Sequence, residues 1–167
     1  MEYRWADGQY ERLGALATDL VHQPVGLIAA VGGAVSAQAA KAATSTIAIV
    51  FVSGGDPVQH GLVASLSRPG GNVTGVSLIT AALGGKRLEL LSELLPSVRV
   101  VAMLINPKNP DAEFEAKDIQ TAARALGREI RVLKVTTEAD FEPVFATLVQ
   151  QRVGALIVGA DPFVNRR

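Results

Sequence analysis

Four loops rich in Gly, Asn, Asp and Pro carry the side chains best suited to hold a small polar ligand. The carboxylates of Asp56 and Asp161 could hold an amine, and the amide of Asn106 can both donate and accept hydrogen bonds. Gly33 lets the backbone approach a ligand closely, and a helix that begins there offers N–H groups to an anion. The loops are Val31–Ala34, Ser53–Pro57, Asn106–Pro110 and Gly159–Pro162.

Groups for covalent chemistry are largely missing. The chain has no Cys, which excludes disulfides, thiolate zinc sites and Cys nucleophiles. No dinucleotide loop, phosphate loop, nucleophile elbow or metal-ligand spacing occurs. His22 and His60 have no partner motif, and no general acid or nucleophile accompanies Asp56 and Asp161. We therefore expect a binding protein rather than an enzyme, with no catalytic residue, metal or cofactor.

The composition of the chain further narrows the class of protein to which it can belong. The 167 residues include 16 Lys and Arg against 16 Asp and Glu, and 49% are apolar, which is not the composition of a disordered segment. A neutral chain lacks the basic footprint that nucleic acid requires. Its longest apolar run, 25–35, falls short of the roughly 20 residues of a membrane span. The polar start has no signal-peptide pattern, so this chain as it stands is expected to remain in the cytoplasm.

The elements that position the loops alternate between strand and helix. Apolar segments predict strands at 25–31, 47–52, 72–77, 98–105, 129–135 and 155–158, and we expect the 47–52 strand to be buried on both faces. Helical spacing predicts helices at 10–21, 34–43, 86–95 and 113–126, a short one through Leu62–Leu66, and one from Phe141 with Thr137 and Asp140 as its N-cap. This alternation predicts an α/β fold with parallel sheets, whose carboxyl edges carry the loops.

The turn cluster Arg68–Asn72 is the best candidate for a boundary. We expect two unfinished lobes, 1–72 and 73–167, rather than one complete domain. Lys86 and Arg87 are expected to be solvated surface charges.

Stretches spread over essentially the whole chain form a specific combination. They are Tyr3–Leu13, Lys41–Ile47, Ile49–Val58, Gly61–Leu66, Arg68–Val76, Lys86–Leu91, Asn106–Pro110 and Gly159–Phe163. Together they resemble the ABC-transporter substrate-binding protein family of the tryptophan/tyrosine-binding type. The resemblance implies a type I periplasmic-binding-protein fold, in which two Rossmann-like lobes with parallel sheets are hinged around an interlobe cleft.

The resemblance also implies a function, a location and partners. Such proteins capture a small polar, amino-acid-like solute in the periplasm or another extracytoplasmic space and deliver it to an ABC permease, without covalent chemistry. Carried over by position, the residues of one wall are Gly33, Ala34, Ser53 and Asp56, and those of the other wall are Asn106 and Asp161. Family members commonly have a small hydroxyl residue after the glycines, where this chain has Ala34 and Val35.

The chain departs from the family in extent. Members begin with an export signal, a first strand and a helix, and continue past Phe163, so we expect a truncated form with both lobes incomplete. In the usual 2-1-3-4-5 strand order the first lobe lacks its central strand. The second lobe keeps the strands 98–105, 129–135 and 155–158, which can pair as a contiguous sheet in the order 2-1-3. The second lobe should be the more stable, and an apolar face exposed in the first would favour self-association.

Two alternatives remain at this point. One is the ligand-sensing domain of a transcription regulator, which shares this fold, although no helix-turn-helix precedes it. The other is an enzyme on a doubly wound α/β fold, which would need a nucleotide loop that the sequence lacks.

Overall fold

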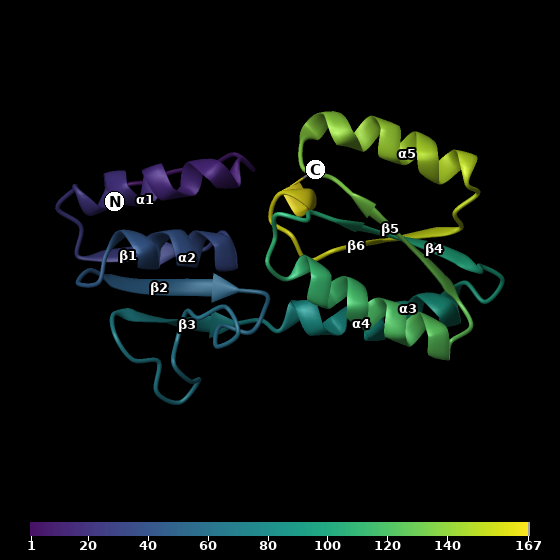
Figure 1. Cartoon of the computed structure of the whole chain (residues 1–167), viewed down its shortest axis with the longest axis horizontal. Helices are drawn as coiled ribbons and strands as arrows, with labels where there is room; N and C mark the ends of the chain where they lie inside the picture. The colour runs from purple at the N-terminus through teal and green to yellow at the C-terminus, as the bar shows by residue number, and fades with distance from the viewer. Residues whose placement is uncertain (167) are drawn as a thin grey trace. The chain divides into compact units, whose positions relative to one another are not determined.

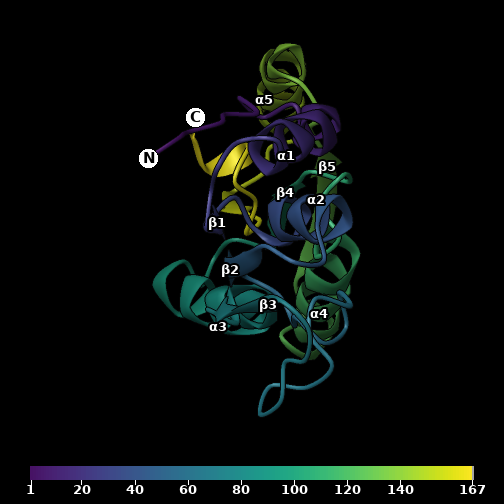
Figure 2. The same ribbon diagram turned by 90° about the vertical axis from the view of Figure 1, so that its left-hand side faces the viewer.

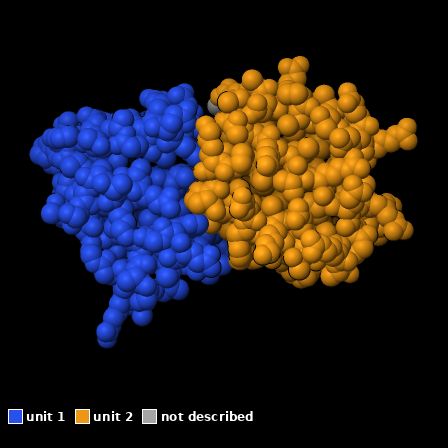
Figure 3. Space-filling view, in the orientation of Figure 1, with its two compact units in different colours: residues 1–79 blue, residues 80–167 orange. Residues whose placement is uncertain are grey.

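The chain forms two compact units, residues 1–79 and 80–167, in a computed structural model that describes residues 1–166 (Figure 1, Figure 3). The first unit comprises η1 (Tyr10–Arg12), α1 (Leu13–Val21), β1 (Leu27–Ala30), α2 (Ala34–Ala43), β2 (Ala48–Ser53) and β3 (Val73–Ser77). The second comprises η2 (Thr80–Leu83), α3 (Gly84–Leu94), β4 (Val100–Ile105), α4 (Ala112–Ala125), β5 (Glu129–Lys134), η3 (Glu138–Asp140), α5 (Phe141–Gln150), β6 (Ala155–Val158) and η4 (Val164–Arg166). The predicted α/β pattern with parallel sheets is confirmed.

The sheet of the first unit has the parallel order β1-β2-β3. Ile28 pairs with Ile49, and Ile49 pairs with Val73, so these side chains share one face. That face is buried beneath α2, where Ala37 and Ala40 pack against it. Small alanines on α2 let the helix approach the β-branched strand residues closely, which explains why an Ala-rich segment serves here.

The other face of this sheet is exposed. Leu27 is 52% exposed, Val50 37% and Val76 55%, and burial alternates along β2. The expectation that 47–52 is buried on both faces is therefore wrong. In residues 1–79, α2 packs on β2 while α1 packs on α2, so both helices lie on the same side of the sheet.

The sheet of the second unit has the order β5-β4-β6, which confirms the predicted 2-1-3 arrangement. The central strand β4 is buried from Val101 to Ile105. One face packs against α3 and α4 through Leu88 and Ile119, while α5 lies on the opposite face (Figure 1, Figure 2). Two crossovers in opposite directions along a sheet place their helices on opposite faces, because parallel crossovers are right-handed.

The boundary between the units differs from the sequence prediction. The expected boundary between 72 and 73 falls one strand too early, because β3 pairs in register with β2 from Val73 to Ser77. The expected short helix through Leu62–Leu66 is also wrong. The N–H groups of Leu62 and Val63 both donate to the carbonyl of Pro57, and Gly61 has φ +64, which ends the turn before a helix can form.

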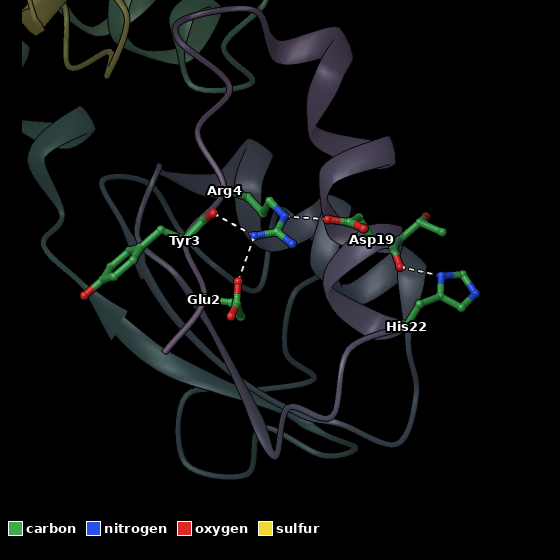
Figure 4. A network of polar contacts seen from close by, with 6 residues as sticks. Glu2, Tyr3, Arg4, Asp19 and His22 are labelled. Carbon is green, nitrogen blue, oxygen red and sulfur yellow. Dashed lines mark hydrogen bonds and ion pairs between the residues drawn. The ribbon is translucent and has the colours of Figure 1, made fainter.

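The N-terminal residues 1–4 form no strand; they are attached to α1 by side chains. The Arg4 guanidinium donates to the carboxylates of Asp19 and Glu2 and to the carbonyl of Tyr3 (Figure 4). The rings of Tyr3 and Trp5 stack at a centroid distance of 6.1 Å and both remain exposed. Among the described residues, no helix has the length and apolar character needed to span a bilayer.

Candidate functional site

In the first unit, the loop after β1 is shaped by a glycine and a serine. Gly33 has φ +80 and precedes α2, whose first residue, Ala34, is buried. The Ser36 hydroxyl accepts the N–H of Gly32 at 3.0 Å and donates to the carbonyl of Gly33 at 2.8 Å. The first turn of α2 thus brings a hydroxyl back to the loop three residues after Gly33, where it is bonded to the loop's own backbone.

The loop after β2 carries the other two predicted residues of this unit. Ser53 is buried and its hydroxyl accepts the N–H of Gly55 at 3.3 Å. Asp56 is exposed, and its Oδ1 accepts the N–H groups of Val58 at 2.8 Å and Gln59 at 3.4 Å. Asp56 therefore caps the following turn while its side chain stays at the surface.

Ser77 belongs to the same edge and was not predicted. Its hydroxyl donates to the carbonyl of Gly55 at 2.8 Å, and the N–H of Leu78 donates to the carbonyl of Ser53 at 2.8 Å. These bonds join the ends of β2 and β3. The signal was present, because 72–77 was predicted as a strand, but its carboxyl end had been assigned to the other lobe.

In the second unit, the structure brings Asn106 and Asp161 together. Both side chains are buried, and Asn106 Nδ2 donates to Asp161 Oδ1 at 3.5 Å. The same Oδ1 accepts the N–H groups of Phe163 and Val164, at 2.9 and 3.0 Å. Asn106 follows β4 and Asp161 follows β6, and these neighbouring parallel strands have their carboxyl ends at the same edge of the sheet.

A second asparagine supports this edge. Asn109 Nδ2 donates to the carbonyl of Ala160 at 3.1 Å, while Asn109 Oδ1 accepts the N–H of Asp111 at 3.0 Å. Asn109 thus connects the loop after β4 to the loop after β6. Its signal was the second Asn-Pro of the Asn106–Pro110 loop.

A buried glutamate lies beneath the same loop and was missed by the sequence analysis. Glu115 Oε2 accepts the N–H of Ala160 at 2.9 Å, and Glu115 Oε1 lies 3.3 Å from Arg87 Nη1. Burial raises the pKa of Glu115, and the Ala160 N–H and the Arg87 charge oppose that rise. The expected solvation of Arg87 is thus wrong, since it pairs with Glu115, whereas Lys86 is exposed and pairs with Glu89.

A sequence signal for Glu115 did exist. Ala112, Ile119 and Ala123 are buried on one stripe of α4, and Glu115 is the charged residue that interrupts it. A charge on an apolar stripe needs a specific partner, but the sequence does not show which residue supplies it.

These edges can recognise a ligand through hydrogen bonds and charge. Asp161 and Asp56 present carboxylates, Asn106 an amide and Ser53 a hydroxyl. Within residues 1–166, no three His, Asp or Glu side chains gather in a way that could hold a metal ion.

A family model for ABC transporter substrate binding protein matches residues 1–165 of this chain. A curated relative, the tyrosine-binding protein of Clostridioides difficile, is 30% identical over 129 residues, which are 77% of this chain and 36% of that protein. This chain therefore spans about a third of the length of that relative.

Solved structures share the fold. A conserved domain protein from Vibrio cholerae is 27% identical, with a TM-score of 0.80 over 90% of this chain and 50% of that one. The ABC domain in complex with L-Trp from Streptococcus pneumoniae is 23% identical, with a TM-score of 0.78 over 92% of this chain and 52% of that one. Because the family model covers nearly every residue, the transcription-regulator and enzyme alternatives are not favoured. The chain belongs to the ABC transporter substrate binding protein family.

Proposed function

We propose that this chain supplies ligand contacts of the solute-binding component of an ABC importer, and that the solute is a small, polar, amino-acid-like molecule. The family match over residues 1–165 supports the transport role. In this proposal the protein binds its ligand outside the cytoplasmic membrane, performs no covalent chemistry and delivers the ligand to an ABC permease.

The observation that carries the proposal is the buried pair of Asn106 and Asp161 at the carboxyl edge of the second sheet. Burying an amide and a carboxylate is costly, and the hydrogen bonds that Asp161 accepts offset this cost and fix the carboxylate in place. Their position beyond the ends of two neighbouring parallel strands is where α/β sheets bind ligands. We therefore assign Asn106 and Asp161 as ligand contacts of this unit.

The first unit supplies the remaining proposed contacts at its own carboxyl edge. Ser53 and Asp56 follow β2, and Gly33 and Ala34 follow β1, all on strands that run parallel. The backbone of Gly33 and Ala34 suits a carboxylate, since the first N–H groups of a helix favour an anion. A carboxylate of the protein suits the ammonium group of the same ligand.

An aromatic amino acid is the ligand class that we propose. The relative that is 30% identical is named a tyrosine-binding protein. An aromatic L-amino acid offers an ammonium and a carboxylate, which match the carboxylates and backbone N–H groups of the proposed contacts, and a ring, which suits the apolar lining typical of ligand pockets.

Thermal unfolding of the purified chain with L-tyrosine, L-tryptophan and L-phenylalanine tests the function. A ligand at about 100 times its Kd adds about 2.7 kcal/mol to the free energy of unfolding. For a chain of this size that corresponds to a rise in Tm of roughly 5–10 °C. D-tyrosine is the matched control, because it has the same ring and charges in the opposite configuration. No rise with any L-amino acid, or an equal rise with D-tyrosine, would contradict the proposal.

A further inference from the structure

Glu115 is a buried charge of the second unit, with its side chain only 3% exposed. Its two oxygens face different partners. Oε2 accepts the backbone N–H of Ala160 at 2.9 Å, and Oε1 faces the Arg87 guanidinium at 3.3 Å. An apolar residue would continue the stripe of α4 but could not accept that N–H. The glutamate is therefore suited to holding the loop rather than to filling the core.

The loop 159–163 is held on both sides of Gly159. Arg87 Nη1 also donates to the carbonyl of Val158 at 3.4 Å, and the N–H of Gly159 donates to Leu104 at 2.8 Å. A Cβ at residue 159 would lie 3.0 Å from the Leu104 carbonyl oxygen and 3.2 Å from Glu115 Oε2. Glycine at 159 thus makes room for the glutamate to reach the loop.

The next peptide groups connect this support to the proposed ligand contacts. Ala160 donates its N–H to Glu115 and accepts from Asn109 through its carbonyl, so both of its polar groups are held. Asp161 follows directly, and its carboxylate meets Asn106. A shift of the Ala160 peptide would move Asp161.

We propose that Glu115, paired with Arg87, is a positioning residue for ligand binding: it holds the loop 159–163 so that Asp161 and Asn106 keep their binding geometry. This inference rests on the proposed function, because it assigns the loop a ligand. Glu115 acts through the loop and does not itself touch the ligand.

The charge of Glu115 gives the role a distinctive pH dependence. The charged groups around it are Arg87 on α3, Asp111 before α4 and Asp118 one turn along α4, while Asp161 lies in the loop itself. Burial raises the pKa of Glu115 above its ordinary value. Protonation removes the attraction to Arg87 and weakens the bond from Ala160. Ligand affinity should therefore fall as the pH is lowered through this raised pKa.

The stability of the unliganded chain should respond in the opposite direction. Because the folded state holds the Glu115 proton more tightly than the unfolded state, this group's contribution to the free energy of unfolding decreases as the pH rises through the same window. If Glu115 had a purely structural role, the affinity for the ligand would rise and fall with the free energy of unfolding. A positioning role makes affinity rise with pH while this contribution to stability falls.

The test measures L-tyrosine affinity by titration calorimetry from about pH 4 to about pH 8, a range that brackets the ordinary and raised pKa of a glutamate. Glu115→Gln should weaken L-tyrosine binding about tenfold near neutral pH. The affinity of this variant should also lose the pH dependence that the titration of Glu115 gives the wild type. Glu113→Gln is the matched control on an exposed position of the same helix, and should bind like the wild type. Equal affinity of Glu115→Gln and wild type at every pH overturns the inference.

Arg87→Met provides a second variant, since Arg87 is 36% exposed and its replacement is better tolerated by the fold. Losing this cation raises the pKa of Glu115 further, so the acid-side loss of affinity should begin at a higher pH than in the wild type. An unchanged pH profile in Arg87→Met contradicts the paired role.

A ligand-independent measurement separates this inference from the proposed function. The amide of Ala160 in the ¹⁵N spectrum should titrate with Glu115 in the wild type and lose that titration in Glu115→Gln. If the wild type binds no L-tyrosine, the proposed ligand class fails, while the Ala160 amide still reports whether Glu115 holds the loop 159–163. A flat Ala160 amide in the wild type overturns it.

Discussion

The amide of Asn106 lies 3.5 Å from the carboxylate of Asp161, although the two residues are 55 positions apart in the chain. Both are buried at the ends of adjacent parallel strands. Asp161 also accepts two backbone N–H groups, from Phe163 and Val164, so the carboxylate is fixed by the protein's own backbone. A group held in this way loses little conformational freedom when a ligand binds.

Replacing Asp161 by Ala should destabilise the chain by roughly 1–2 kcal/mol, because two backbone N–H groups at buried positions lose their acceptor. Urea unfolding measures the loss. Asp56→Ala is the matched control: it removes a carboxylate with two backbone bonds from an exposed position, and its loss should be clearly smaller. Equal losses for the two variants would show that burial of Asp161 adds nothing.

Asp140 should make stability depend on pH in strongly acidic solution. Its carboxylate accepts the N–H groups of Thr136 and Thr137 and the hydroxyl of Thr136, which lowers its pKa from 3.8 to about 2. A lowered folded pKa means that the stabilisation is present above the unfolded value and is lost as the pH falls from about 4 to about 2. Unfolding midpoints over that range should fall more steeply in the wild type than in Asp140→Asn. Parallel slopes would contradict this assignment.

Gly75→Ala should destabilise the first unit by about 2 kcal/mol or more. A Cβ at residue 75 would overlap the carbonyl oxygen of Phe51 and lie 2.5 Å from its Cγ. Phe51 is buried in the core of that unit and cannot move aside. Gly26→Ala, with nothing within 4 Å of the added Cβ, should change the free energy of unfolding by less than about 0.5 kcal/mol. Urea unfolding of both variants checks the contrast, and similar values would refute it.

The strand and helix pattern, and one pairing at the site, were predictable from the sequence for a physical reason. Apolar runs and helical spacing are local properties, so the six strands and the main helices appear close to their expected positions. Asn106 and Asp161 could be grouped because the carboxyl ends of parallel strands share an edge. That grouping also needed the strand order, which the family resemblance implied.

Other features depend on contacts that no local pattern contains. The apolar run 47–52 matches a strand buried on both faces, but Val50 is exposed because both helices of that unit lie on the same side. Glu115 interrupts the apolar stripe of α4, but its partner, the N–H of Ala160, lies 45 positions later in the chain and no local pattern identifies it. In both cases burial is set by which element lies opposite, which is a tertiary property.

Amide hydrogen exchange should show stronger protection in residues 98–158 than in residues 25–52. The central strand β4 is buried on both faces, whereas β2 has one exposed face, and local opening costs less where fewer apolar contacts are lost. Mass spectrometry of exchanged peptides gives the comparison directly. Equal or greater protection in 25–52 would contradict this difference in local stability.

We propose that ligand contacts lie at the carboxyl edges of the two parallel sheets. The most direct test is the ¹⁵N–¹H spectrum of the labelled chain titrated with L-tyrosine. Saturable shifts concentrated in residues 31–34, 53–57, 106–110 and 159–163 are expected. Saturable shifts confined to the amino ends of the strands, or no shifts at all, would contradict it.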